Sequence, residues 1–164
     1  MTGLSAPTLQ ERVAQAEAIE AVSRLKARYF RLMDQKMWDD WEELFAPNAV
    51  MDMRGEVAAM KQLGMNVGDA EGWVLQSRAS IRAAVELALE GVTTVHYGHM
   101  PEFAVQSPNE ICATWAMTDV IRYPPGRPVA GFHGFGHYHD VYVLTEQGWS
   151  ILEIVLKRLT VKSI

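Results

Sequence analysis

One histidine and one aspartate occupy positions that two neighbouring strands would bring together. Gln106 to Asn109 have the composition of a tight turn between two predicted strands. If Gln106 pairs with Asn109, the same antiparallel register places His96 directly opposite Asp119. A carboxylate beside an imidazole fixes the ring tautomer and stabilises the protonated ring, which is how a general base is commonly oriented.

The surroundings of this pair are predicted to be apolar. Period-two alternation puts four further side chains on the same face: Met100, Trp115, Met117 and Ile121. This face is the more apolar one, so we expect it to face the interior. Pro101 is a candidate bulge position, and a slip of one residue would turn His96 to the other face. The pattern is equally compatible with a purely structural histidine–aspartate hydrogen bond.

Tyr29 and Asp34 stand at the end of a predicted long helix. Tyr29 falls on its apolar stripe, where an inward phenol can donate to a substrate oxygen. Asp34 in a dry site can be held protonated and act as an acid. Ordinary packing of Tyr29 and an ordinary turn position for Asp34 are the alternatives.

No metal site is predicted. Four histidines are candidate ligands: His99, His133, His137 and His139. His137 and His139 would share one strand face, but the sequence has no HExxH motif and no fitting third ligand. It also has no GxSxG, P-loop or GxGxxG motif, and Cys112 is the only cysteine. These absences argue against covalent serine or cysteine catalysis and against nucleotide chemistry.

Length, charge and composition narrow the class of protein. A chain of 164 residues with 49% hydrophobic residues fits one globular domain, 1–164. The net charge of −5 argues against a nucleic-acid partner. The one basic concentration lies at helical spacing and is interpreted as a solvated helix face: Arg24, Lys26, Arg28 and Arg31. No signal peptide or membrane span is recognisable, so a cytoplasmic location without membrane contact is expected.

The first third of the chain is predicted to be helical. Thr8 and Glu11 have the spacing of a capping box, which starts a helix that runs to about Gln35. Its apolar stripe comprises Ile19, Val22, Leu25, Tyr29 and Leu32. A short second helix covers Trp38 to Phe45 and ends before Pro47, and a short strand follows from Ala49 to Met53.

The rest of the chain is predicted to change from helix to strand. Arg54 to Gln76 show no sustained period and are expected to form a loop over a pocket. Ser80 to Leu89 are expected to form a third helix. Four long strands follow: Thr93–Val105, Glu110–Tyr123, Phe132–Thr145 and Gly148–Val161. Helices followed by a meander predict an α+β fold with the helices on one face of a curved antiparallel sheet.

Several motifs, in this order and spacing, resemble one family. They are Leu25-Lys26-Ala27-Arg28-Tyr29-Phe30 with Asp34 and Trp38-Asp39-Asp40-Trp41, Leu44-Phe45-Ala46-Pro47-Asn48-Ala49-Val50, His96-Tyr97-Gly98-His99-Met100-Pro101-Glu102, and Gly136-His137-Tyr138-His139-Asp140 with Tyr142 and Trp149. From Ile19 to about Val161 the chain resembles the SnoaL-like branch of the nuclear transport factor 2-like superfamily. The resemblance implies a cone-shaped α+β barrel with a deep apolar pocket, and residues 1–8 would be a flexible tail.

The resemblance also implies partners and site residues. Family members such as scytalone dehydratase, bile acid 7α-dehydratase, ketosteroid isomerase and polyketide cyclases form dimers or trimers, and most need no cofactor. In the dehydratases, residues that look like Tyr29, Asp34, His96 and Asp119 carry the acid-base work. Tyr138 and Arg158 would line the cavity. Scytalone dehydratase has a second histidine at the position of Asp119, so the complete mechanism of that enzyme cannot be assigned to this chain.

These lines together predict a cofactor-free dehydratase or isomerase that acts on a hydrophobic ring compound with a carbonyl group. His96 would remove a proton next to the carbonyl, Tyr29 would hydrogen-bond the enolate oxygen, and Asp34 would protonate the departing hydroxyl. Five residues would bind the substrate: Met100, Trp115, Met117, Tyr138 and Arg158. A non-catalytic binding or assembly module, and an epoxide hydrolase-like activity, are the alternatives.

Overall fold

A long helix begins where the capping box predicts it. The computed structural model describes residues 6–164 and places α1 at Leu9–Asp34. The backbone N–H of Glu11 donates to Thr8 Oγ1 over 3.2 Å, and the N–H of Thr8 donates to Glu11 Oε2 over 2.7 Å. The capping box is therefore confirmed. The predicted flexible tail, residues 1–8, lies mostly outside the described residues.

The two sides of α1 differ in exposure almost as the pattern predicts. Val22, Leu25, Tyr29 and Leu32 are buried, whereas Arg24, Arg28 and Arg31 are exposed. The assignment of Lys26 to the solvated face is wrong, because its side chain is fully buried. A neighbouring carboxylate, Asp140 on the sheet, explains why the helix can turn this lysine inward.

Short elements follow α1. They are α2 (Trp38–Glu42), β1 (Phe45–Asp52), α3 (Arg54–Gln62), the 3₁₀ helix η1 (Ala70–Trp73), β2 (Val74–Gln76) and α4 (Arg78–Ala88). The prediction of a loop from Arg54 to Gln76 is wrong in part, because the segment contains α3, η1 and β2. The longest of these has only 9 residues, too few for a sustained period. Pro47 does not end a helix but lies within β1.

The second half of the chain is a series of strands. They are β3 (Thr93–Gly98), β4 (Glu102–Ser107), β5 (Glu110–Arg122), β6 (Gly131–Thr145) and β7 (Gly148–Ser163). The predicted strand Thr93–Val105 is thus two strands, which separate on either side of Pro101. Both pair with β5, so the break bends the sheet without changing the order of its neighbours.

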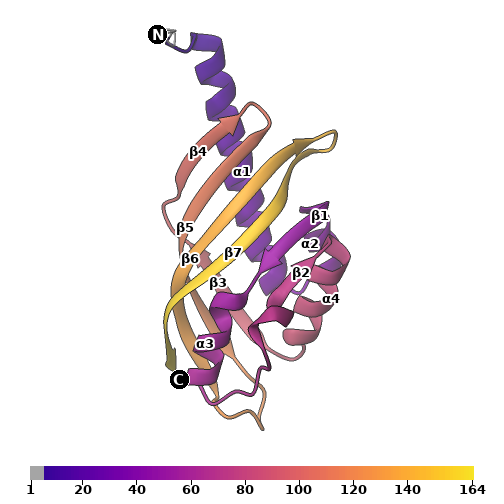
Figure 1. Ribbon diagram of the computed structural model, residues 1–164, viewed down its shortest axis with the longest axis vertical. Helices are drawn as coiled ribbons and strands as arrows, with labels where there is room; N and C mark the ends of the chain where they lie inside the picture. The colour runs from indigo at the N-terminus through magenta and orange to yellow at the C-terminus, as the bar shows by residue number, and fades with distance from the viewer. Residues whose placement is uncertain (1–5) are drawn as a thin grey trace.

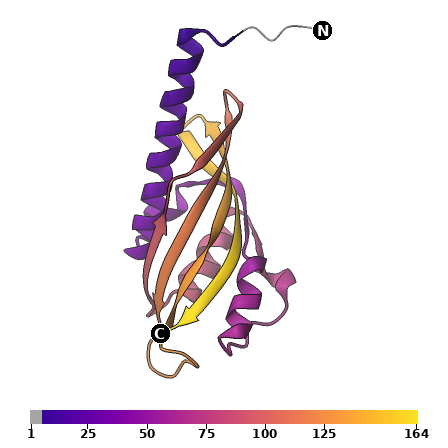
Figure 2. The same ribbon diagram turned by 90° about the vertical axis from the view of Figure 1, so that its left-hand side faces the viewer.

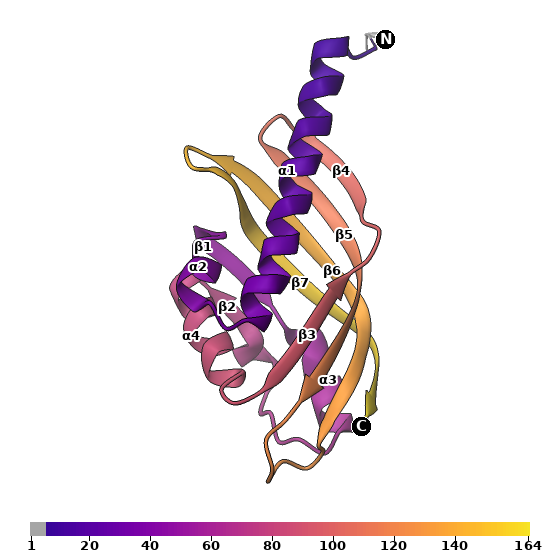
Figure 3. The same ribbon diagram turned by 180° about the vertical axis from the view of Figure 1, so that it is seen from behind.

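The strands form one curved sheet with helices against it. Their order is β2-β1-β7-β6-β5-β3, with β4 also paired to β5, and every pairing is antiparallel except β1 with β7. The described strands do not close into a barrel (Figure 1). The helix α1 crosses one face of the sheet (Figure 3), and its N-terminal end extends beyond the strands (Figure 2). An α+β cone fold of this kind is what the resemblance predicts.

The strand register settles which side chains meet. His96 on β3 lies directly opposite Asp119 on β5, as predicted. Trp115, Met117 and Ile121 are buried on the same face of β5. The main core lies between this face and α1, and no helix of residues 6–164 is long and apolar enough to cross a membrane.

Candidate active site

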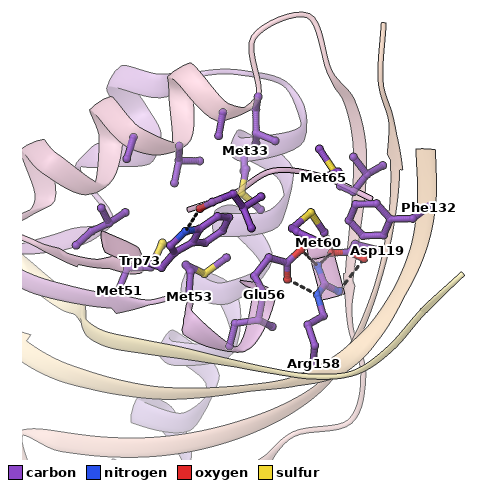
Figure 4. A pocket seen from close by; sticks show the side chains of 18 of the residues that line it. Met33, Met51, Met53, Glu56, Met60, Met65, Trp73, Asp119, Phe132 and Arg158 are labelled. Atoms are coloured by element: carbon purple, nitrogen blue, oxygen red, sulfur yellow. Dashed lines mark hydrogen bonds and ion pairs between the residues drawn. The ribbon is translucent and has the colours of Figure 1, made fainter. Parts of the chain in front are cut away.

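A cavity of about 440 Å³ lies between the sheet, the end of α1, α4 and the segment from α3 to η1. Its walls are mainly apolar (Figure 4), and five methionines contribute to them: Met33, Met51, Met53, Met60 and Met65. Trp73 of η1 closes part of the wall, and its indole N–H donates to Val67 O over 3.1 Å. Flexible thioether side chains let such a wall adapt to the shape of a ligand.

His96 reaches the cavity from β3 and is held from behind by Asp34. The Nδ1 atom of His96 lies 2.7 Å from Asp34 Oδ1, and the backbone N–H of His96 donates to Asp34 Oδ2 over 2.8 Å. The hydroxyl of Thr94 donates to Asp34 Oδ1 over 2.8 Å. The carboxylate is therefore surrounded by three donors, which fix it and the ring together.

This contact determines which imidazole nitrogen is basic. Because Nδ1 faces a carboxylate, we assign the ring proton to Nδ1, so Nε2 carries the free lone pair. The Nε2 atom of His96 lies 4.0 Å from Asp119 Oδ2, beyond hydrogen-bond distance. The predicted orienting role thus moves from Asp119 to Asp34. Asp34 does not line this cavity, so its predicted acid role stays a prediction.

Asp119 is instead paired with Arg158 of β7. The guanidinium donates from Nη1 to Asp119 Oδ1 over 2.9 Å and from Nη2 to Asp119 Oδ2 over 2.5 Å. Both side chains are almost fully buried and line the cavity. A two-bond arginine–carboxylate pair neutralises the aspartate beside the base and holds it in place.

Glu56, which the sequence analysis missed, binds the other side of the same guanidinium. Its Oε2 accepts from Arg158 Nε over 2.5 Å, and its Oε1 accepts from Nη2 over 3.2 Å (Figure 4). Burial raises the pKa of Glu56, an effect that Arg158 opposes and the charge of Asp119 increases. No signal in the sequence marks Glu56, because α3 is too short to show a helical period.

Two glycines make room for this cluster. A Cβ atom on Gly55 would overlap the carbonyl oxygen of Leu156, so α3 lies directly on the backbone of β7. This close approach brings the next residue, Glu56, to Arg158. A Cβ atom on Gly134 of β6 would overlap both Arg158 Nη1 and Asp119 Oδ1. Side chains at either position would displace the ion pairs.

Two buried phenols add to the polar lining. Tyr29 of α1 and Tyr138 of β6 both line the cavity, and their ring centroids are 6.4 Å apart. Burial raises the pKa of both hydroxyls far above 10, with nearby negative charge adding to the effect. Both groups therefore stay protonated, and both can donate hydrogen bonds.

Three predicted substrate contacts do not line this cavity. Met100 is 93% exposed, because the chain leaves β3 after Gly98 and the alternation that pointed it inward ends there. Trp115 is buried against Phe103, on the side of the sheet core next to α1. Met117 lies beneath Arg158, whose Nη1 is 3.5 Å from its sulfur. Tyr138 and Arg158 do line the cavity.

Within residues 6–164, no cluster of three or more histidine, cysteine, aspartate or glutamate side chains could hold a metal ion. The rings of His137 and His139 are 6.4 Å apart on the face of β6 opposite the buried Tyr138. Desolvation, followed by the charges of Lys157 and His137, lowers the pKa of His139. This pair is remote from the cavity lining and gives no third ligand.

Comparisons with known proteins give consistent results. A probable cyclase of Gibberella zeae is 27% identical over 150 residues, which cover 87% of this chain and 92% of that protein. The solved structure of a putative scytalone dehydratase from Novosphingobium aromaticivorans is 15% identical with a TM-score of 0.75, covering 93% of this chain and 91% of that chain. A hexachlorocyclohexane dehydrochlorinase structure is 10% identical with a TM-score of 0.74, covering 93% of each chain.

At these identities the solved structures show a shared fold and nothing finer. The sequence profile of the SnoaL-like domain matches residues 14–155, which is most of the chain. The fold and the extent of this match agree with the resemblance seen in the sequence. The chain therefore belongs to the SnoaL-like family.

Proposed function

We propose that this protein is a cofactor-free lyase or isomerase in which His96 is the general base. The observation that carries the proposal is the contact of 2.7 Å between His96 Nδ1 and Asp34 Oδ1, which leaves Nε2 free beside an apolar cavity. A neutral imidazole oriented by a carboxylate is suited to remove a weakly acidic proton near neutral pH.

The reaction begins with a C–H bond next to a carbonyl group. His96 Nε2 takes the proton, and the electron pair of the broken bond forms an enolate. Tyr29 donates a hydrogen bond to the enolate oxygen and lowers its energy. The imidazolium then returns the same proton, either to a different carbon, which completes an isomerisation, or to a hydroxyl that leaves as water. Asp34 stabilises the imidazolium and does not itself transfer a proton.

The substrate is proposed to be a hydrophobic ring compound such as a steroid, terpenoid or polyketide. A volume of about 440 Å³ lies within the range of roughly 300–1,000 Å³ that is usual for small-molecule pockets. The wall is methionine-rich and apolar, with a few polar groups at one end. Relatives described as a probable cyclase, a putative scytalone dehydratase and a dehydrochlorinase support a role in processing small molecules.

The proposal is tested by proton exchange, which does not require the natural substrate. The bicyclic ketone 2-tetralone is incubated with the protein in D₂O, and loss of its α-proton signals is followed by NMR. We expect the native protein to accelerate exchange and the H96Q variant to lose about 10⁴-fold of that acceleration. H137Q, on the outer face of β6, is the matched control and should exchange at the native rate.

The outcomes separate an enzyme from a binding module. Exchange that is equally fast in H96Q would reject His96 as the base. A native protein that binds 2-tetralone in calorimetry but does not accelerate its exchange would reject catalysis of this class and favour the non-catalytic alternative.

We propose further that the protein forms homodimers or homotrimers through the outer face of the sheet. The helices lie against the opposite face, so β5 and β6 are uncovered (Figure 1). Val120 and Val141 are partly exposed there, and Phe135 is exposed. Light scattering should give a dimer or trimer for the native chain and a smaller species for F135E. A native monomer at micromolar concentration would contradict this assembly.

A further inference from the structure

The guanidinium of Arg158 has no donor left for a ligand. Of its five N–H groups, the Nε group and one on Nη2 face Glu56, and the other on Nη2 and one on Nη1 face Asp119. The remaining Nη1 group faces the sulfur of Met117. A substrate oxygen can therefore reach this arginine only if one of these partners is displaced.

The local charge also disfavours an anion. Arg158 carries one positive charge and is in contact with two carboxylates, Glu56 and Asp119. His96, when protonated, is balanced by Asp34 behind it. The polar end of the cavity thus carries an excess of negative charge in either protonation state of His96, and like charges in a poorly solvated site repel strongly.

We propose that Glu56 is a specificity-determining residue: by occupying Arg158, it restricts the cavity to neutral ligands and excludes carboxylates. Without Glu56, Arg158 would offer two free donors in the fork geometry that binds a carboxylate. This inference deepens the proposed function and rests on it only in taking this cavity as the substrate site, because it concerns binding and no chemical step.

One other cation lines the cavity and must be separated from Arg158. Arg127, in the segment between β5 and β6, is exposed and lies 5.8 Å from the ring of Tyr123. An anion held there would sit at the solvent-facing side, away from the floor formed by Glu56 and Arg158. The test therefore includes R127Q as a background.

Two ligands of similar shape and different charge test the proposal by calorimetry at pH 7.5. They are 2-acetonaphthone, which is neutral, and 2-naphthoate. We expect the native protein to bind the ketone at least about 10-fold more tightly than the acid. In E56Q, binding of naphthoate should strengthen about 10-fold or more, while binding of the ketone changes little. The gain should persist in E56Q/R127Q.

Control variants separate a specific effect from charge or folding. E71Q removes one negative charge from the exposed part of η1 and should leave the preference unchanged. If E56Q fails to fold by circular dichroism, E56D retains the charge on a shorter side chain and should give a smaller gain in naphthoate binding. R158Q should abolish any naphthoate binding gained in the E56Q background.

Several results would overturn the proposal. These are equal binding of both ligands by the native protein, an unchanged preference in E56Q, or a gain that is lost in E56Q/R127Q. The chemistry is tested apart from this, because H96Q should lose proton exchange and keep the preference for the neutral ligand. If H96Q loses proton exchange but E56Q still prefers the neutral ligand as the native protein does, the result would reject the proposed role of Glu56 and leave the proposed chemistry standing.

Discussion

Two groups of buried charges lie within residues 6–164, and they differ in what surrounds them. One is the pair Lys26–Asp140, whose charged atoms are 2.8 Å apart and whose side chains are both fully buried. The Nζ atom of Lys26 lies 4.4 Å from the ring centroid of Tyr29 and 4.0 Å from that of Tyr138. The other group is Arg158 with its two carboxylates on the cavity wall.

The comparison shows how position decides what a buried charge can do. Lys26 has one carboxylate partner and aromatic rings, and Asp140 accepts a further bond of 2.6 Å from the Tyr142 hydroxyl. Lys26 borders an open hollow beside α1 and β3, but Asp140 lines neither that hollow nor the apolar cavity, and the pair joins α1 to β6. Arg158 and both of its carboxylate partners line the apolar cavity, beside His96. A buried charge is therefore the stronger functional candidate here where its whole ion-pair group lines the cavity.

The largest expected effect is the loss of catalysis when Asp34 can no longer orient His96. In D34N an amide nitrogen would face one of the three donors that now surround the carboxylate, so His96 would lose its orientation. We expect proton exchange on 2-tetralone to fall by about 10³- to 10⁴-fold, as for the equivalent change in a catalytic triad. D39N, an exposed position on α2, is the control. Exchange within a few-fold of native in D34N would show that the dyad is structural.

The second prediction concerns the Lys26–Asp140 pair. K26M keeps the length of the side chain but leaves Asp140 buried without a cation. We expect the free energy of unfolding to fall by about 3–5 kcal/mol in urea titrations. The double variant K26M/D140N removes both charges and should regain much of this loss. The rate of proton exchange per folded K26M molecule should change far less than the rate in D34N. Unchanged stability in K26M would contradict the structural role of the Lys26–Asp140 pair.

The smallest expected effect is a difference in the pH dependence of stability. Burial raises the pKa of Glu56 above its ordinary 4.5, so the folded state holds this proton more tightly than the unfolded state. The contribution of Glu56 to stability must therefore fall as the pH rises from 4.5 through its folded pKa. The native protein should therefore lose stability relative to E56Q as the pH rises across this window. A difference that rises with pH would mean that Arg158 outweighs burial.

Burial lowers the pKa of Lys26, which gives a slope of the opposite sign. The unfolded state then binds the proton more tightly, so this contribution to stability rises with pH up to about 10.5. Urea titrations of K26M/D140N below pH 10.5 should lack this rise. The two groups thus give pH dependences of opposite sign.

The pairing of His96 with Asp119 was predicted correctly, although the turn pairing from which it was predicted is wrong. The hairpin pairs Ser107 with Glu110, and an irregularity beside Val105 shifts the register before β4 continues. The break at Pro101 shifts it again, which restores the pairing of His96 with Asp119. Alternation of buried side chains along β5 fixes the faces more firmly than the turn fixes the pairing.

The parts that could not be predicted depend on contacts between distant segments. Lys26 follows the same spacing as its exposed neighbours, and only Asp140, far along the chain, makes its burial tolerable. Glu56 lies 102 residues from Arg158, in a helix too short to show a period. Asp34 was predicted as a site residue from its place at the end of the helix and from the family resemblance, but its contact with His96 depends on how α1 meets β3.

Gly134 gives the site an unusual dependence on a residue with no side chain. It lies opposite Asp119 on the neighbouring strand, and the space that its missing methyl group leaves is filled by the arginine and the aspartate. Any attempt to redesign this enzyme candidate by mutating only the residues that touch a ligand would overlook this constraint. The arrangement of charges at the polar end of the cavity therefore depends partly on Gly134 of β6, which does not itself line the cavity.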